Sequence, residues 1–448
     1  MISKKPVVLL VTLNLLIVVC YILWSGTSDS SLFSLSKITL RKVEEGIGLV
    51  EDMKKCSLAI GMTTDELDEL EHVATKAETF LKALQRIVTP TKFSEELKNP
   101  CWPRNSSDNF TIDKLEEEIT SNSTESQLVG ETSRRLFCLP YFFLAGFPKC
   151  GTTSIHNTLK RHPQIIAPVI KEPHWWARTP LRNMGPSYVK HISMRYLHYF
   201  GRAARKLSIL PSNLTITYDG TQSTLWDSNF FSKINHLDYC AMPSIVSRTL
   251  PSAKFIVIMR NPVTRAFSDY YYQCNHYRVS SWPRSMQENP AKYFHTSVLK
   301  DIAAFNSCLK NDIHSLQWCL GKLRSLPSGC GYVGERLIIG LYYFHLQEWM
   351  TFYPKESFLF LRTEDIFEEP HRIMTRMTDF LDVDPVSEDE AKQWLSRVSN
   401  VHHERPAIEP DKLVMMTESK ELLEDFFAPY NTMLAELTGD RRFLWKDV

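Results

Sequence analysis

Residues 141–161 read YFFLAGFPKCGTTSIHNTLKR. The apolar run at the start, the turn that carries Gly146 and Gly151, and the residues from Ile155 onward predict a strand, a loop and a helix in succession. A helix N-terminus offers unpaired backbone N–H groups and the positive end of a dipole, and Gly151 lets the backbone approach an anion closely. The segment therefore predicts a phosphate-binding loop.

The side chains of this loop favour a phosphate site of a kind other than an NTPase. Thr152, Thr153 and Ser154 add hydroxyl donors, and Lys149 adds a full positive charge. In the Walker A pattern a lysine follows the second glycine, whereas here Thr152 follows it and the lysine lies in the middle of the loop. From this motif alone, an ordinary strand-to-helix connection stays open as an alternative.

Short runs of strand-forming residues continue along the chain, separated by stretches long enough for crossover helices. The expected strands are 141–145, 214–218, 254–259 and 357–361. This alternation predicts an α/β fold with a central parallel sheet flanked by helices. Ligands of such sheets bind at the carboxyl ends of the strands, which is where the loop at 146–154 is expected.

A second anion site is expected after the strand at 254–259. Arg260 ends that strand, Pro262 is well suited to begin a helix, and Ser268 follows about two helical turns later. A guanidinium group and a hydroxyl suit a second phosphate, although an arginine at a strand end is more commonly a surface ion-pair partner. Two anion sites on one sheet predict a nucleotide that carries phosphates at separate positions.

The N-terminus predicts a membrane anchor. Pro6–Trp24 is uncharged and mostly apolar, follows Lys4 and Lys5, and has about the ~20 residues that a helix needs to cross a bilayer. We therefore expect a cytoplasmic tail at 1–5, a signal anchor at 6–24 and a lumenal remainder. A cleaved signal peptide is the alternative.

Glycosylation sequons and cysteines agree with a lumenal location. The sequons begin at Asn105, Asn109, Asn122 and Asn213. With Cys20 in the anchor and Cys150 in the loop, eight of the ten cysteines could pair, as expected in an oxidising compartment. Cys308, Cys319 and Cys330 are close enough in sequence to pin a loop. A zinc site is the less favoured alternative, because no Cys-x2-Cys pair is present.

Residues 25–135 are predicted to form a lumenal stem, and residues 136–448 the catalytic domain. Within the stem, apolar residues recur at alternating spacings of three and four over 64–88. This spacing is typical of a coiled coil, which would allow a homodimer through the stem. An amphipathic helix that packs on the catalytic body is the alternative.

Residues 149–206 contain eleven lysines and arginines and one acidic residue, Glu172. A local positive field of this kind favours a polyanionic partner, and the lumenal topology favours a glycan over a nucleic acid. Trp175 and Trp176 are placed to stack on sugar rings or, alternatively, to fill the core beside the loop.

Three segments, Pro148–Ser154, Lys171–Trp176 and Arg260–Tyr270, resemble the membrane-bound Golgi carbohydrate sulfotransferases. The resemblance covers about 140–446. It implies a P-loop-like sulfotransferase fold and the donor 3′-phosphoadenosine 5′-phosphosulfate, with no metal required. It also implies a single-pass type II protein of the Golgi membrane. The residues implied to hold the 5′-phosphosulfate are Lys149, Cys150, Gly151, Thr152, Thr153 and Ser154.

By the same resemblance, Arg260 and Ser268 hold the 3′-phosphate, and Arg405 belongs to a basic loop that closes over the nucleotide. Glu172 is implied to be the base that deprotonates the acceptor hydroxyl, with Lys149 neutralising the leaving group. His174 is a rival base because the imidazole group in general suits proton transfer near neutral pH, and a structural ion pair is the alternative role of Glu172.

Two departures from the family pattern concern the second phosphate loop and the acceptor, respectively. Asn261 stands where an aspartate is common, and Asp219-Gly220-Thr221-Gln222 stands where heparan-type relatives have Glu-Lys-Thr-Pro. The second departure weakens the heparan assignment, and the resemblance implies transfer to a chondroitin or dermatan-type glycosaminoglycan, at C6 of N-acetylgalactosamine 4-sulfate. The alternatives are a heparan sulfate or protein-tyrosine sulfotransferase, and an inactive lumenal glycan-binding protein. The presence of Lys149, Glu172, Arg260 and Ser268 argues against the last of these.

Overall fold

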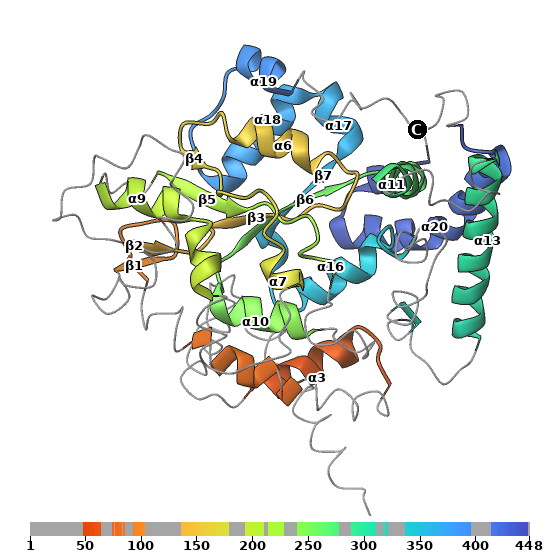
Figure 1. The fold of residues 1–448 in the computed structure, drawn as a ribbon, viewed down its shortest axis with the longest axis horizontal. Coiled ribbons are helices and arrows are strands. Elements are labelled where there is room, and N and C mark those ends of the chain that lie inside the picture. Colours follow the sequence, from red (N-terminus) through yellow and green to blue (C-terminus); the bar gives the residue numbers. More distant parts are fainter. Residues whose placement is uncertain are drawn as a thin grey trace, which may run out of the picture. The chain divides into compact units, whose positions relative to one another are not determined.

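A parallel sheet organises the chain in the computed structural model (Figure 1). The structure describes residues 48–63, 74–75, 77–82, 84–85, 93–103, 136–178, 193–209, 214–227, 240–276, 288–310, 316, 319–320, 337–395 and 414–446. The sheet has five strands in the order β4-β5-β3-β6-β7. Their bounds are β3 Phe142–Leu144, β4 Ile165–Ile166, β5 Ile216–Asp219, β6 Lys254–Met259 and β7 Phe358–Arg362.

Helices cover both faces of the sheet, so the described chain forms three layers (Figure 1). One face carries α6 (Thr152–Leu159), α17 (Thr363–Glu368), α18 (Pro370–Leu381) and α19 (Glu388–Leu395). The other carries α7 (Trp175–Arg178), α10 (Ala241–Thr249) and α16 (Tyr342–Met350). At the right of Figure 1 lie α11 (Pro262–His276), α13 (Pro290–Leu309) and α20 (Thr417–Thr438). The short helix η4 (Lys355–Ser357) directly precedes β7, and η6 (Arg441–Leu444) follows α20 and packs on it.

The strands are apolar because both of their faces are covered. Every residue of β3 is buried, as are the five residues of β6 that follow Lys254. Aromatic rings stack across three neighbouring strands, with centroids 5.2 Å apart for Phe143 and Phe255 and 5.0 Å apart for Phe255 and Phe358. The predicted α/β fold and the four expected strands are confirmed within a residue or two. The two-residue β4 was not predicted.

A second, two-stranded sheet pairs β1 (Cys101–Pro103) with β2 (Leu136–Cys138) in antiparallel fashion, beside α9 (Gly201–Ile209). Cys101 lies opposite Cys138, and the two form a disulfide. Of the three cysteines expected to pin a loop, Cys308 and Cys319 are bonded to each other. Cys330 lies outside the described residues.

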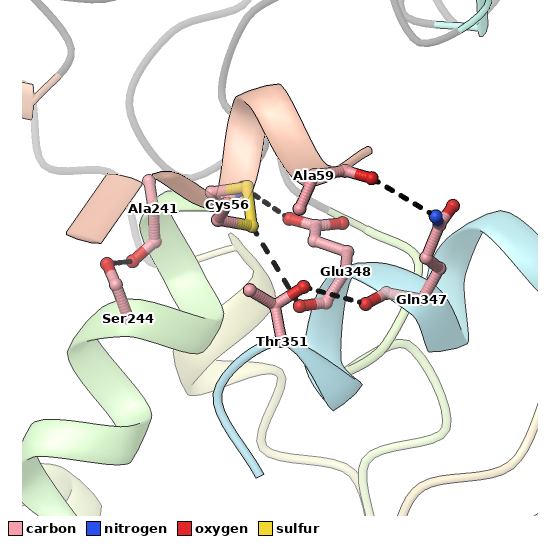
Figure 2. The surroundings of a disulfide bond; sticks show 8 residues. Cys56, Ala59, Ala241, Ser244, Gln347, Glu348 and Thr351 are labelled. Carbon is pink, nitrogen blue, oxygen red and sulfur yellow. Dashed lines mark hydrogen bonds between the residues drawn. A yellow bond between two sulfur atoms is a disulfide. The ribbon is translucent and has the colours of Figure 1, made fainter. Parts of the chain in front are cut away.

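A third disulfide ties part of the predicted stem to the body. Cys56 on α3 (Leu49–Ala59) is bonded to Cys240 at the start of α10 (Figure 2). The carboxylate of Glu348 accepts a hydrogen bond from the Cys240 N–H at 2.5 Å, and Gln347 donates to the Ala59 carbonyl at 3.3 Å. One compact unit accordingly runs from Ile47 to Val448 and includes this segment.

The described part of the predicted coiled coil also packs on the body. Ala74, Ala77, Leu81 and Leu84 are buried in the same core as the sheet, and the Phe80 ring lies 6.1 Å from that of Trp175. These positions fit the alternative of an amphipathic helix on the body and are not available to a partner chain. They give no support to a dimer through this segment.

Several predicted features lie outside the described residues: the anchor at 6–24, the four asparagines of the sequons, and Arg405. Among the helices that the structure describes, none combines the length and the apolar character needed to cross a membrane.

We expect a secreted chain that begins at Ile47 to fold, and one that begins at Leu136 to fold poorly. The shorter chain loses Cys56 and Cys101, the disulfide partners of Cys240 and Cys138, and uncovers core that α3 buries. Loss of one native disulfide typically costs about 2–4 kcal/mol. The measurements are secreted yield from cultured cells and resistance to trypsin.

A matched control is the Ile47 chain with Cys56→Ala and Cys240→Ala, which should be secreted with a lowered melting temperature. Equal yield and protease resistance of the two truncated chains would contradict this account.

Candidate functional site

The carboxyl edge of the sheet gathers the predicted site residues. Because β3 lies between β5 and β6, the loops that follow these three strands are neighbours. The phosphate loop follows β3, Arg260 follows β6, and Asp219 ends β5. The segment that carries Glu172 follows β4 and is joined to the phosphate loop, where the Lys171 ammonium donates to the Thr153 hydroxyl at 3.1 Å. The structure therefore brings the two expected anion sites and the expected base to one edge.

The phosphate loop has the backbone geometry that its glycines predict. Gly151 has a φ of 87°, in the left-handed region, and α6 begins at Thr152. A Cβ on Gly146 would lie 2.5 Å from the Thr152 Cγ2, so no larger residue fits there. As at any helix start, the first-turn N–H groups of α6 have no acceptor within the helix. The loop can therefore direct several N–H groups at one anion.

Lys149 lies in this loop with a φ of 67°. Its ammonium group is 4.2 Å from the centroid of the Tyr272 ring, a cation–π contact with a partly exposed tyrosine on α11. Burial lowers the pKa of Lys149; the charge of Asp269 opposes this effect and that of Arg260 adds to it. An anion bound at the loop would offset the electrostatic repulsion between Lys149 and Arg260.

Arg260 joins the second expected anion site to the first. Its Nη1 lies 3.5 Å from the carbonyl oxygen of Lys149, so the two loops are in contact. Ser268 is half-buried on α11, next to Asp269, whose carboxylate forms a fully buried ion pair with Arg265 at 2.9 Å. That ion pair spans one turn of α11 and fixes the helix that carries Ser268.

Asn261 performs the task that an aspartate would perform at this position. Its side-chain oxygen accepts a hydrogen bond from the Val263 N–H at 3.0 Å at the start of α11. Asparagine and aspartate are both good N-cap residues, because each offers a side-chain oxygen. The backbone N–H of Asn261 donates to Glu364 at 2.8 Å, which ties this loop to the end of β7. The departure from the family pattern leaves the loop intact.

Glu172 lies in a group of charged and polar side chains. Its carboxylate forms an ion pair with Lys171, and its Oε2 lies 3.5 Å from the His174 Nε2. Burial would raise the pKa of Glu172, but the hydrogen bond from His174 and the charge of Lys171 outweigh burial and lower it to about 2. The side chain keeps 27% of its surface exposed. Glu172 is thus both ion-paired and accessible.

Two residues that follow β5 fix the position of His174. Its Nδ1 is 2.7 Å from the Ser223 hydroxyl, and its backbone N–H donates to the Thr221 hydroxyl at 3.2 Å. Ser223 and Thr221 were not among the predicted site residues. These two bonds turn the Nε2 of the ring toward Glu172.

Gly220 and Asp219 form the support under this segment. A Cβ on Gly220 would lie 2.6 Å from the Lys171 carbonyl oxygen, so the absence of a side chain allows the two segments to touch. The buried Asp219 accepts hydrogen bonds from the Tyr196 hydroxyl at 2.8 Å and from the Thr221 N–H at 2.9 Å.

The tryptophans are core residues, so the structure decides between the two alternatives that the sequence left open, in favour of the core. Trp175 and Trp176 are 4% and 1% exposed. Trp175 stacks on Tyr196 with ring centroids 4.6 Å apart, and the indole N–H of Trp176 donates to the Tyr196 hydroxyl at 2.8 Å. Their role is to support the neighbouring Glu172 segment. Within the described chain, no group of three or more His, Cys, Asp or Glu side chains could hold a metal ion.

Sequence reasoning missed two residues that contact the phosphate loop from other elements. Tyr342 on α16 lies 3.7 Å from the Cys150 Sγ, and the Thr363 hydroxyl donates to the Cys150 carbonyl at 2.8 Å. Thr363 follows β7 directly, so its place at a strand end was the available signal. Tyr342 is one of many aromatic residues in its segment, and nothing in the sequence distinguishes it.

Comparison with known proteins agrees with this arrangement. A family model described as "Sulfotransferase domain" matches residues 139–406. Carbohydrate sulfotransferase 15 of Rattus norvegicus is 30% identical over 395 residues, which cover 80% of this chain and 67% of that protein.

Two other proteins are more distant. The bifunctional heparan sulfate N-deacetylase/N-sulfotransferase 2 of Homo sapiens is 26% identical over 312 residues, covering 67% of this chain and 29% of that protein. A solved sulfotransferase from Alicyclobacillus acidocaldarius covers 67% of this chain and 96% of its own, with 20% identity and a TM-score of 0.39. On the match to the family model, and in agreement with the resemblance in its loops, the chain belongs to the sulfotransferase domain family.

Proposed function

We propose that the protein transfers a sulfuryl group from 3′-phosphoadenosine 5′-phosphosulfate to a hydroxyl of a glycosaminoglycan, at C6 of N-acetylgalactosamine 4-sulfate in chondroitin or dermatan sulfate. The observation that carries the proposal is the contact between two anion-binding loops at the ends of β3 and β6, where Arg260 reaches the Lys149 carbonyl. A donor that carries phosphate groups at the 3′ and 5′ positions of one nucleoside matches this pair of loops. A carbohydrate acceptor agrees with the relatives named carbohydrate sulfotransferase 15, and the proposed glycan and position follow from the family resemblance of the loops.

The donor roles follow from the two loops. The N–H groups at the start of α6, with Lys149, Thr152, Thr153 and Ser154, are proposed to hold the 5′-phosphosulfate. Cys150 and Gly151 contribute backbone to the same cradle. Arg260 and Ser268 are proposed to hold the 3′-phosphate, and Arg405 to cover the nucleotide.

In the proposed reaction Glu172 removes the proton of the acceptor hydroxyl, whose oxygen forms a bond to sulfur as the bond from sulfur to the phosphate oxygen breaks. Lys149 neutralises the charge that develops on the departing phosphate. In the donor-free protein Glu172 is a weak base, because its pKa is about 2. Lys171 is shared between Glu172 and the Thr153 hydroxyl. A sulfuryl group at the phosphate loop would draw Lys171 away from Glu172 and so raise the basicity of the carboxylate.

The proposed location is the Golgi membrane, with the anchor at 6–24, a stem and a lumenal catalytic body. Three disulfides among the described residues support an oxidising compartment.

A radiolabelled donor and a panel of defined glycosaminoglycans, followed by disaccharide analysis, test this function. We expect label at C6 of N-acetylgalactosamine 4-sulfate, and loss of at least about 10²-fold in kcat for Lys149→Ala and Glu172→Gln. The exposed Lys160, at the opposite end of α6, gives a control, because Lys160→Ala should leave transfer intact.

Label only on heparan sulfate or on tyrosine peptides would replace the acceptor assignment. No transfer to any acceptor would favour a glycan-binding protein. Full activity of Glu172→Gln would move the base role to His174.

We expect Lys171→Met to change the pH dependence of the reaction. Lys171 helps to lower the pKa of Glu172, so its removal lets burial raise that pKa, and the carboxylate takes up a proton at a higher pH. The value of kcat/KM for the donor, which reports the donor-free enzyme, should therefore fall more steeply for the variant than for the wild type as the pH decreases from 7 to 4. Parallel profiles would show that Glu172 is not the titrating base.

Gly220→Ala should impair transfer because its Cβ collides with the Lys171 carbonyl and displaces Glu172. We expect kcat to fall about tenfold or more, with a small change in melting temperature. Gly201→Ala is the matched control, since a Cβ there meets no atom within 4 Å. Equal kcat values for the two variants would refute the role assigned to this contact.

A further inference from the structure

Two hydroxyl groups lie in the seam between the two anion-binding loops. The Tyr342 hydroxyl donates to the Arg260 carbonyl at 2.9 Å and is 3.7 Å from the Cys150 Sγ. The Thr363 hydroxyl lies 2.8 Å from the Cys150 carbonyl and 3.2 Å from the Met259 carbonyl. Each hydroxyl therefore contacts Cys150 in the phosphate loop and also a carbonyl group at or just after the end of β6, where the second loop begins.

The rings and helices around Tyr342 hold its hydroxyl in place. The side chain is 1% exposed, and its ring centroid is 4.5 Å from that of Phe147, which is itself in the phosphate loop. Burial raises the pKa of Tyr342 well above its ordinary value, so the hydroxyl keeps its proton and acts as a donor. Burial also raises the pKa of Cys150 to about 11, so its contact with Tyr342 joins neutral groups.

Movement of one loop is linked to movement of the other because it would break hydrogen bonds of the Tyr342 and Thr363 hydroxyls, at a cost in free energy. A shift of the phosphate loop away from β6 would separate the Thr363 hydroxyl from one of its two carbonyls and the Tyr342 hydroxyl from Cys150 or Arg260. A buried polar group without its partner is unfavourable, which disfavours such a shift. Arg260 adds a third connection through its contact with the Lys149 carbonyl.

We propose that Tyr342 and Thr363 are positioning residues that couple the two loops, so that occupation of one phosphate site organises the other. The proposal rests on the proposed function, because it requires a ligand with phosphates at both ends. Neither residue needs to touch the donor. Coupling of this kind would appear as a gain in affinity when one ligand carries both phosphates.

The test is calorimetric titration of the folded lumenal protein with adenosine 5′-monophosphate and with adenosine 3′,5′-bisphosphate. The ratio of the two dissociation constants measures the gain from the 3′-phosphate. We expect Tyr342→Phe to reduce this gain roughly fivefold, the factor that corresponds to one buried hydrogen bond. Thr363→Val should reduce it similarly, and it tests the proposal independently if Tyr342→Phe does not fold.

Tyr353→Phe is a matched control. The Tyr353 hydroxyl is equally buried and donates to the Leu250 carbonyl at 2.9 Å, away from both loops. We expect this variant to have a lower melting temperature, as Tyr342→Phe does. Its affinity gain from the 3′-phosphate should stay within about twofold of the wild-type value. An unchanged gain in both Tyr342→Phe and Thr363→Val would overturn the coupling while leaving the proposed function in place. A wild-type protein that binds neither nucleotide would overturn both.

Discussion

The parallel pairing of β3 with β6 is the constraint on which the site depends. The ladder continues beyond Leu144, because the Ala145 N–H donates to the Ile256 carbonyl at 2.9 Å and the Phe147 N–H donates to the Ile258 carbonyl at 3.2 Å. The first half of the phosphate loop is thus an extension of the sheet, and it turns into α6 only after Gly151. Since β6 ends at Met259, the same ladder sets the distance between the phosphate loop and Arg260. Any change that slips this register by one residue would turn the side chains to the other face and separate the two anion sites.

Electrostatics at this edge are unfavourable in the donor-free protein in a way that suits an anionic ligand. Burial and the charge of Arg260 both lower the pKa of Lys149. The nearby acidic partners are already engaged, since Asp269 forms an ion pair with Arg265 and Glu172 with Lys171. An anion at the loop would stabilise the charged form of Lys149 and compete with Glu172 for Lys171. In the proposed reaction, donor binding and the activation of Glu172 as the base would therefore be linked through Lys171.

Local patterns predicted the sheet and the two loops, because a buried parallel strand is an uninterrupted apolar run and a phosphate loop needs glycine at particular turns. The misses have a common cause. Cys56 pairs with Cys240 across 184 residues, and Tyr342 meets Cys150 across 192, so no local signal marks either contact. Trp175 and Trp176 were ambiguous because an aromatic side chain beside a loop looks the same in sequence whether it faces a ligand or the core.

The departure at Asp219 and Gly220 bears on the proposed acceptor, because it distinguishes this chain from the heparan-type pattern. In that pattern a lysine stands at the position of Gly220, where even a Cβ would lie 2.6 Å from the Lys171 carbonyl. A lysine at this position is therefore incompatible with the path of the Lys171–His174 segment, and Lys171 itself supplies the cation that pairs with Glu172, the proposed base. Asp219 is fully buried and accepts hydrogen bonds from Tyr196 and Thr221, so its carboxylate supports this segment from within the core. Because the backbone of the segment after β4 occupies the space beside Gly220, a basic group that meets the proposed acceptor would come from other segments of this edge.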